Sequence, residues 1–249
     1  MEKAVTDIAA FRDSFGVIVQ MDGDGADSCN RIALYYSCLA ILKAQEDDLN
    51  RPPEDGFYIS TTRLTANLPH GRYARHPDRS KWYSDMENVT RDQMAPMIAA
   101  MALFGTKTML KQHLRLRLPR LLTHFSTRGQ DDATGGTRRK LPDLPSPGEL
   151  ANMIRGLNLV LLWPLLLLLD AAVLIEVYLL TEKNGEEGKV LLDIAVAKKS
   201  LSTPLSYLSR VLLKRKKAAF TTAVLNYHSG PRNGIPPLAA LTIAALDAV

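Results

Sequence analysis

The chain is poor in cysteine and in aromatic residues: it holds two cysteines in 249 residues, and aromatic residues make up 6%. Cys29 and Cys38 fall on one predicted helix, where nine residues correspond to roughly 13.5 Å of rise. A disulfide needs Cα atoms within about 7 Å of each other, so these two thiols do not pair. No signal-peptide pattern opens the sequence, and we expect a reducing compartment, either cytoplasmic or virion-associated.

Several signatures are missing as well. The sequence shows no repeat of fixed period and no zinc, helix-turn-helix or RNA-binding pattern. Basic residues gather in two places: residues 107–140 hold nine Lys and Arg against two Asp, and residues 198–217 hold seven with no acid. In the first of these clusters, leucines are interspersed among the basic residues, as in an ordinary amphipathic helix. We therefore expect a solvated face or a contact with an acidic partner surface, and no nucleic-acid binding.

Hydrophobic residues make up 46% of the chain, which is enough to build a core. Most segments repeat apolar residues every three or four positions, the pattern of helices packed on one face. We predict a mostly α protein, a compact multi-helix bundle of the orthogonal or (α/α) type, with one minor β-hairpin near 16–20 and 57–62. Residues 1–249 are expected to form a single helical domain, with a weak division into 1–130 and 145–249 around the polar linker 126–146.

Helix boundaries are marked by capping residues. Thr90 with Gln93, and Ser146 with Glu149, have the spacing of a capping box, and Thr203-Pro204 and Pro236-Pro237 open two later helices. Further helices are expected over 1–15, from Ser28 to Leu49, from Thr106 to Phe125 with a bend at Pro119, and from Leu191 to Leu201. Residues 50–89 show little periodicity and are expected to form a long loop.

The most apolar run covers residues 157–180. Its length approaches the roughly 20 residues that cross a bilayer, but Asp170 and Glu176 interrupt it and Pro164 lies inside it. A charge near the centre of a bilayer costs roughly 2.5–3.5 kcal/mol. The run is therefore expected to form a buried core helix, or two short helices, and a membrane partner is not expected. The alternative is a membrane-associated helical protein that uses residues 157–180.

Two short stretches concentrate polar chemistry: residues 21–31 and residues 75–93. In the first, Asp22, Asp24 and Asp27 stand close together, and such carboxylates repel unless a cation, an arginine or water offsets their charge. Ca²⁺ is one candidate cation, since it prefers clustered oxygens. The calcium-loop pattern is not met, however, because Ala26 stands where the third ligand should be and Asp27 stands where the pattern needs glycine. No metal-ligand set is therefore assigned.

Acid–base chemistry is the second interpretation of these aspartates. Arg31 lies four residues after Asp27 and shares its helix face, which leaves Asp22 or Asp24 to face a cleft. Asp92, at the mouth of another helix, would supply the second carboxylate of a pair with separated pKa values. The alternative is a solvated turn in which Asp27 or Ser28 caps the helix.

Residues of the second stretch allow two interpretations each. Arg91 either pairs with the acidic turn or lies in solvent. His76 is either a general base or a surface residue. Trp82 and Tyr83 either stack on a sugar or cover the core.

Two motifs of this sequence resemble the motif style of (α/α)-barrel carbohydrate-active proteins. The first is Asp22-Gly23-Asp24-Gly25 followed by a helix. The second is Trp82-Tyr83-Ser84-Asp85 leading to Thr90-Arg91-Asp92-Gln93. The resemblance covers residues 20–95, and 249 residues are few for a complete barrel of six helix pairs. It implies acidic and aromatic residues in loops at one end of paired helices, and a polysaccharide or glycoside ligand. The residues that it singles out are Asp22, Asp24, Asp27, Trp82, Arg91 and Asp92.

The sequence thus predicts a carbohydrate-active, hydrolase-like or sugar-binding helical protein with an Asp-rich site. Its candidate catalytic residues are Asp24, Asp27 and Asp92, and its candidate substrate-binding residues are Asp22, Arg31, His76, Trp82, Tyr83 and Arg91. The alternative is a non-enzymatic structural protein, for example a virion component. The N-terminal part of one copy, residues 1–106, has a net charge of −4, and the remainder of the chain has a net charge of +9. The acidic part would contact the basic part of a neighbouring copy.

Overall fold

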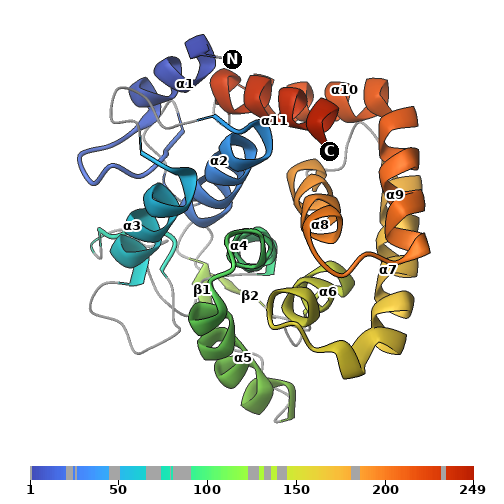
Figure 1. Ribbon diagram of the computed structural model, residues 1–249. Coiled ribbons are helices and arrows are strands. Elements are labelled where there is room, and N and C mark those ends of the chain that lie inside the picture. Colours follow the sequence, from blue (N-terminus) through green and yellow to red (C-terminus); the bar gives the residue numbers. More distant parts are fainter. Residues whose placement is uncertain are drawn as a thin grey trace.

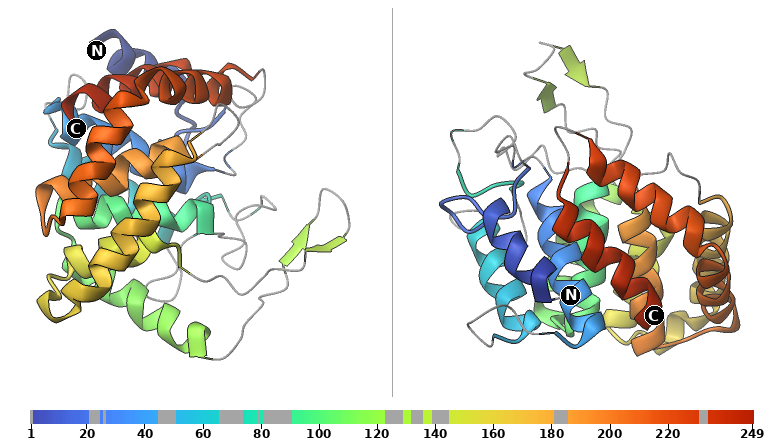
Figure 2. Two further views of the ribbon diagram at one scale, coloured as in Figure 1. Left: turned by 90° about the vertical axis from the view of Figure 1, so that its right-hand side faces the viewer. Right: turned by 90° about the horizontal axis from the view of Figure 1, so that it is seen from above.

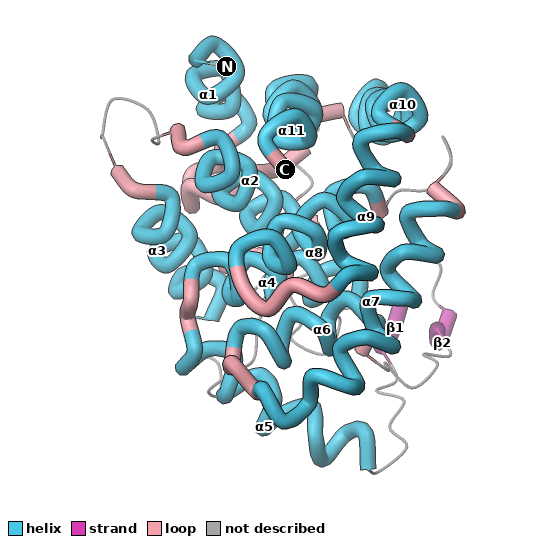
Figure 3. Tube along the Cα trace, turned by 45° about the vertical axis from the view of Figure 1, so that its right-hand side comes forward, coloured by secondary structure: helices cyan, strands magenta, loops and turns pink. Residues whose placement is uncertain are grey.

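The computed structural model describes residues 2–20, 25, 27–44, 51–65, 74–78, 80, 91–122, 129–131, 136–138, 145–180, 186–230 and 234–249. Within these ranges, side chains are described except at 2, 65, 91–92, 116–122, 129–131 and 136–138. The described part of the chain is mostly helical (Figure 3).

The helices follow one another with short connections for most of the chain. In the first half they are α1 (Glu2–Asp7), the 3-10 helix η1 (Ile8–Phe11), α2 (Ser28–Leu42), α3 (Pro53–Thr65), α4 (Arg91–Phe104) and α5 (Lys107–Leu122). In the second half they are α6 (Pro147–Gly156), the 3-10 helix η5 (Val160–Leu162), α7 (Trp163–Tyr178), α8 (Glu187–Lys199), α9 (Pro204–Arg215), α10 (Lys217–Ser229) and α11 (Pro236–Ala248).

Helix α8 lies near the middle of the bundle, with other helices on every side of it (Figure 1). It contacts α2, α4, α6, α7, α9 and α10. The even-numbered helices α2, α4, α6 and α8 pack against one another in chain order, and each also packs against the odd-numbered helix that follows it. Contact between α11 and α2 brings the two ends of the chain together. The predicted mostly α, multi-helix bundle is confirmed.

The core explains why α8 is central. Ten of its residues, Glu187 and 189–197, are buried, so the helix is enclosed by others rather than resting on one of them. Buried apolar side chains from Val5 to Val249 form one contiguous cluster that includes α2, α4, α8 and α11. A smaller cluster lies between α6 and α7.

Several predicted helix starts are confirmed by their capping contacts. Ser146 Oγ accepts a hydrogen bond from the backbone amide of Glu149 at 3.1 Å, and Pro147 begins α6. Thr203 and Ser206 form a reciprocal capping box at the start of α9. These side chains satisfy amide groups that have no partner inside the helix.

The β-hairpin predicted near 16–20 and 57–62 is wrong. Residues 57–62 belong to α3, which also replaces part of the long loop expected over 50–89. Pro53 in the first position and Glu54 and Asp55 in the first turn favour that helix. Residues 16–20 contribute one isolated antiparallel bridge, between Ile18 and Arg12.

The strands that do pair lie elsewhere. β1 (Gly129–Asp131) and β2 (Gly136–Arg138) form an antiparallel pair within the segment expected to be a polar linker. They stand apart from the helical body (Figure 2). Helix α5 includes Pro119 and ends at Leu122, three residues before the predicted end.

The apolar run at 157–180 is not a buried core helix. Val160–Tyr178 is long and apolar enough to cross a membrane by length and composition, and 28% of its most apolar window is buried. The expectation fails because α7 lies at the edge of the bundle (Figure 1), where α6, α8 and α9 cover one side of it. Pro164 stands in the first turn of α7, where it does not interrupt the helix. The run therefore forms the short helix η5 followed by one longer helix.

Candidate functional site

The two polar stretches predicted from the sequence meet at the first turns of α2 and α4. The predicted pairing of Asp27 with Arg31 is confirmed, with an Oδ2–Nη2 distance of 3.5 Å. Gln93 Nε2 donates to Asp27 Oδ1 at 2.8 Å, and Gln93 Oε1 accepts from the amide of Asn30 at 3.3 Å. The fully buried Gln93 side chain therefore joins the two helices. The sequence pattern predicted that Gln93 forms a capping box with Thr90, and Thr90 lies outside the described residues.

His76 of the second stretch contacts Asp13, which precedes the first stretch; the sequence suggested that His76 was a surface residue or a general base. Its side chain is buried, and Nε2 lies 2.6 Å from Asp13 Oδ2. Nδ1 accepts a hydrogen bond from the amide of Asp78 at 3.0 Å, which leaves the proton on Nε2 for Asp13. Both ring nitrogens are therefore engaged, and the imidazole holds its segment in place.

Gly25 permits this approach. A Cβ atom at position 25 would lie 2.5 Å from His76 Cδ2, closer than nonbonded carbon atoms come. Nearby, Cys29 Sγ donates to the carbonyl of Ala74 at 3.3 Å. The glycine, the cysteine and the histidine thus bring residues 74–78 against the start of α2.

The predicted catalytic and binding roles stay predictions. Asp22, Asp24, Trp82 and Tyr83 lie outside the described residues, and so do the side chains of Arg91 and Asp92. Asp27 has both carboxylate oxygens engaged, one with Arg31 and one with Gln93. What the structure does establish is that the described residues of the two stretches are neighbours.

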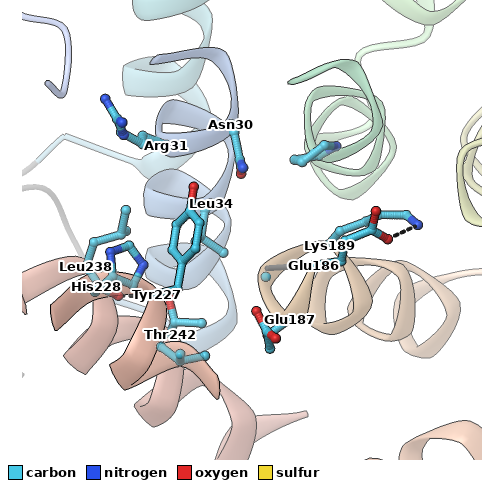
Figure 4. Close-up of a pocket in the computed structure, with 13 residues that line it drawn as sticks. Asn30, Arg31, Leu34, Glu186, Glu187, Lys189, Tyr227, His228, Leu238 and Thr242 are labelled. Carbon is cyan, nitrogen blue, oxygen red and sulfur yellow. Dashed lines mark hydrogen bonds and ion pairs between the residues drawn. The ribbon is translucent and has the colours of Figure 1, made fainter. Parts of the chain in front are cut away.

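A pocket of about 50 Å³ adjoins this junction, and α2 lines it with Asn30, Arg31 and Leu34 (Figure 4). It lies between α2, α4, α8, α10 and α11, and Arg31 belongs both to the junction and to the pocket wall. The lining residues are Asn30, Arg31, Leu34, Pro96, Glu186, Glu187, Gly188, Lys189, Val224, Tyr227, His228, Leu238 and Thr242.

Glu187 is the most unusual group of this pocket. It is the first residue of α8, its side chain is buried, and its Oε1 has no hydrogen-bond partner among the described residues. Burial, with a smaller contribution from the charge of Glu186, raises the pKa of Glu187 to about 7. A carboxyl group with this pKa is substantially protonated at neutral pH, and a protonated carboxyl both donates and accepts hydrogen bonds.

His228 faces the pocket from α10. It is buried, its Nδ1 has no hydrogen-bond partner among the described residues, and its ring meets the ring of Tyr227 edge-on at 5.0 Å. Burial, together with the charge of Arg31, lowers the pKa of His228 to about 4. The imidazole is therefore neutral at pH 7.

Lys189 carries the charge on the α8 side of the pocket. Its Nζ lies 3.1 Å from Glu186 Oε2 and 3.3 Å from Glu176 Oε2. Burial alone would lower the pKa of Lys189, but Asp193, Glu176 and Glu186 together raise it. Figure 4 shows Lys189 and Glu186 directed away from Tyr227 and His228. Near Glu187 and His228 the pocket therefore holds a neutral imidazole and a carboxyl that is about half protonated at pH 7, while the charge of Arg31 is paired with Asp27.

Sequence reasoning missed this pocket because its polar residues come from four separate helices, α2, α8, α10 and α11. Glu186 and Glu187 precede an apolar helix, a pattern that is explained by the favourable interaction of acids with a helix N-terminus. His228 follows a tyrosine near the end of an otherwise ordinary helix. Only the packing of α8 against α2 and α10 brings these side chains together.

Among the described residues, no group of three His, Cys, Asp or Glu side chains is placed to hold a metal ion. Of the three aspartates for which Ca²⁺ was considered, Asp22 and Asp24 lie outside those residues, and Asp27 is engaged by Arg31 and Gln93. Comparison of the chain with protein-family models, with curated proteins and with solved structures finds no match.

Proposed function

We propose that this protein binds a small, neutral, hydroxyl-bearing ligand of the carbohydrate class in the pocket between α2, α8 and α10. The observation that carries the proposal is the buried carboxyl of Glu187, which has an oxygen without a partner at the pocket wall. A buried polar atom without a hydrogen bond costs roughly 1–3 kcal/mol. A ligand that supplies the missing bond recovers this free energy.

The charge state of the wall favours a neutral ligand. A carboxyl with a pKa of about 7 and an imidazole with a pKa of about 4 present donors and acceptors with little net charge at neutral pH. A sugar hydroxyl both donates and accepts, and so matches each of them. Tyr227 adds an aromatic ring beside these groups, a surface on which the apolar face of a sugar packs.

The size of the pocket limits how much of the ligand enters. One water needs roughly 10–15 Å³ of such space, so about 50 Å³ holds about three to five water-sized groups. This admits the hydroxyl-bearing edge of one sugar unit rather than a whole chain. Any remaining units of the ligand would lie outside the pocket.

Hydrolysis is a further part of the proposal. With a pKa near 7, Glu187 has the property of a general acid. Glycoside hydrolysis also needs a second carboxylate as base or nucleophile. Asp24, Asp27 and Asp92 are the candidates from the sequence, and substitution of each by Asn tests them one at a time.

Saturation-transfer NMR with glycerol, glucose and N-acetylglucosamine, and with short oligosaccharides of the two sugars, tests the binding proposal. We expect at least one of these probes to bind and Glu187→Ala to abolish that binding. Glu186→Ala is the matched control, because Glu186 is the adjacent acid but is more exposed and is paired with Lys189. Absence of binding by every probe, or equal binding by Glu187→Ala and the wild type, contradicts the proposal.

A further inference from the structure

A continuous apolar face covers the outer side of η5 and α7. Its residues recur at spacings of four and three, the period of one helix face. They are Leu161, Leu165, Leu168, Ala172, Ile175 and Leu179. Leu161 is 95% exposed and Leu168 70% exposed. Side chains of this kind occur singly on most proteins, but a contiguous row of them marks an interaction site.

This face carries no free charge. Asp170 and Glu176 are the charged residues of 160–178. Asp170 is buried and paired with Arg155 at 2.6 Å, and Glu176 lies 3.3 Å from Lys189 Nζ. Trp163 and Tyr178 stand at the two ends of α7, and both residue types are enriched at the headgroup level of membranes.

A basic segment adjoins the C-terminal end of the face. Lys214, Arg215, Lys216 and Lys217 run from the end of α9 into α10. Lys216 Nζ donates to the carbonyls of Tyr178 and Leu180, and it lies 5.5 Å from the centre of the Tyr178 ring. This contact fixes the basic segment beside the end of α7, where Lys214 and Arg215 are exposed.

We propose that the apolar face of η5 and α7, together with the basic segment 214–217, docks this protein onto the surface of an anionic lipid bilayer. An apolar helix face inserts at the level of the headgroups and upper acyl chains, and each nearby Lys or Arg adds attraction to anionic lipid. This inference is independent of the pocket and of its ligand.

The other side of α7 determines how the helix would lie. That side holds the buried Arg155–Asp170 pair and packs against α6 and α9. A helix that keeps these contacts lies in the plane of the interface and does not span the bilayer. Its 16 residues would cover roughly 24 Å of membrane surface.

Charge favours the bilayer over a second copy of the chain. A two-fold contact through this face would place a second basic segment 214–217 at the same interface. Glu176, the acid on α7 outside the buried pair, is already paired with Lys189. Anionic headgroups offset the basic charge, and a second copy of the same face does not.

Co-sedimentation of the full chain with large unilamellar vesicles tests the proposal. We expect binding to vesicles of phosphatidylcholine with 30% phosphatidylglycerol, weaker binding to pure phosphatidylcholine, and loss of the difference at high salt. The double variant Leu161→Ser/Leu168→Ser should lower the partition coefficient tenfold or more, because both leucines leave water when the face inserts. Lys214→Glu/Arg215→Glu should remove the preference for anionic vesicles.

Tyr58→Ser is the matched control, because Tyr58 is 58% exposed on α3, which has no contact with α7 among the principal helix pairs. It should bind vesicles like the wild type, and circular dichroism should show that every variant is folded. Equal binding by the leucine variant and the control overturns the proposal. So does a dimer in sedimentation velocity, without vesicle binding, that the leucine variant abolishes.

Discussion

Arg155 on α6 and Asp170 on α7 form a buried ion pair, in which Arg155 Nη2 donates to both carboxylate oxygens of Asp170 at 2.8 and 2.6 Å. Asp170 Oδ2 also accepts from Thr203 Oγ1 at 2.6 Å, and Arg155 Nε donates to the carbonyl of Leu201. One charged pair therefore joins α6, α7 and the start of α9. It also explains why an aspartate can lie in the middle of the most apolar segment of the chain.

Breaking this pair should destabilise the fold strongly. Asp170→Asn leaves the guanidinium of Arg155 buried without its counter-charge, a loss of roughly 3–5 kcal/mol in similar cases. Urea denaturation measures the loss as a lower midpoint. Glu176→Gln removes a half-exposed acid of the same helix and should cost less than about 1 kcal/mol. Equal midpoints for the two variants would show that the buried pair does not stabilise the fold.

Gly25→Ala should destabilise the junction of the two polar stretches. The new Cβ would lie 2.5 Å from His76 Cδ2, and His76 cannot move freely because it is bonded to Asp13. Overpacking of this kind costs roughly 1–3 kcal/mol. A double-mutant cycle with His76→Ala isolates the clash. The effect of Gly25→Ala should shrink when His76 is alanine, and an unchanged effect would argue against the contact.

Glu187→Gln should stabilise the protein more at pH 8 than at pH 5. The pKa of Glu187 is raised from 4.5 to about 7, so the folded state holds this proton more tightly than the unfolded chain. The resulting stability is complete below pH 4.5 and is lost as the pH rises through 7. The neutral glutamine has no such loss, and between pH 5 and pH 8 the difference should reach roughly 2.5 kcal/mol. Unfolding midpoints at the two pH values measure it.

Two other groups titrate in the same range, so the comparison must be between variant and wild type. Burial raises the pKa of Asp193 to about 7, so Asp193, like Glu187, makes the fold less stable as the pH rises. The lowered pKa of His228 makes the fold more stable as the pH rises. Both contributions cancel in the difference. Glu186→Gln serves as the control and should show no comparable change with pH. If both variants respond alike, Glu187 is not the titrating group.

The two thiols should be unreactive in the folded protein. Cys29 and Cys38 are buried and are not joined in a disulfide, and burial raises the pKa of Cys38 to about 12 against a smaller opposite effect of its contact with Thr242. The thiolate is the form that reacts. A thiol-specific chromogenic disulfide at pH 8 should therefore label neither cysteine until urea unfolds the chain. Rapid labelling of one thiol in native protein would place that thiol at the surface.

Local chemistry predicted the helices well where capping residues mark them. Ser146, Thr203 and the prolines that follow them fix the starts of α6 and α9, because the missing amide bonds of a helix start are satisfied within three residues. The contact between Asp27 and Arg31 followed from helix spacing in the same way. Helix α3 does not follow from the sequence pattern alone, because Pro53, Glu54 and Asp55 are residue types that occur in loops as well as at the start of a helix.

The sequence by itself determined the helical class, the segment starts and the local pairing of residues three or four apart, since all of these depend on neighbours along the chain. Only the tertiary structure decided that Gln93 joins α2 to α4, that Glu187 and His228 share a pocket, and that α7 keeps an apolar side outward. Those features depend on which helices pack together and at which edge each one lies. Apolar periodicity marks a face that tends to be covered, but it does not identify what covers it.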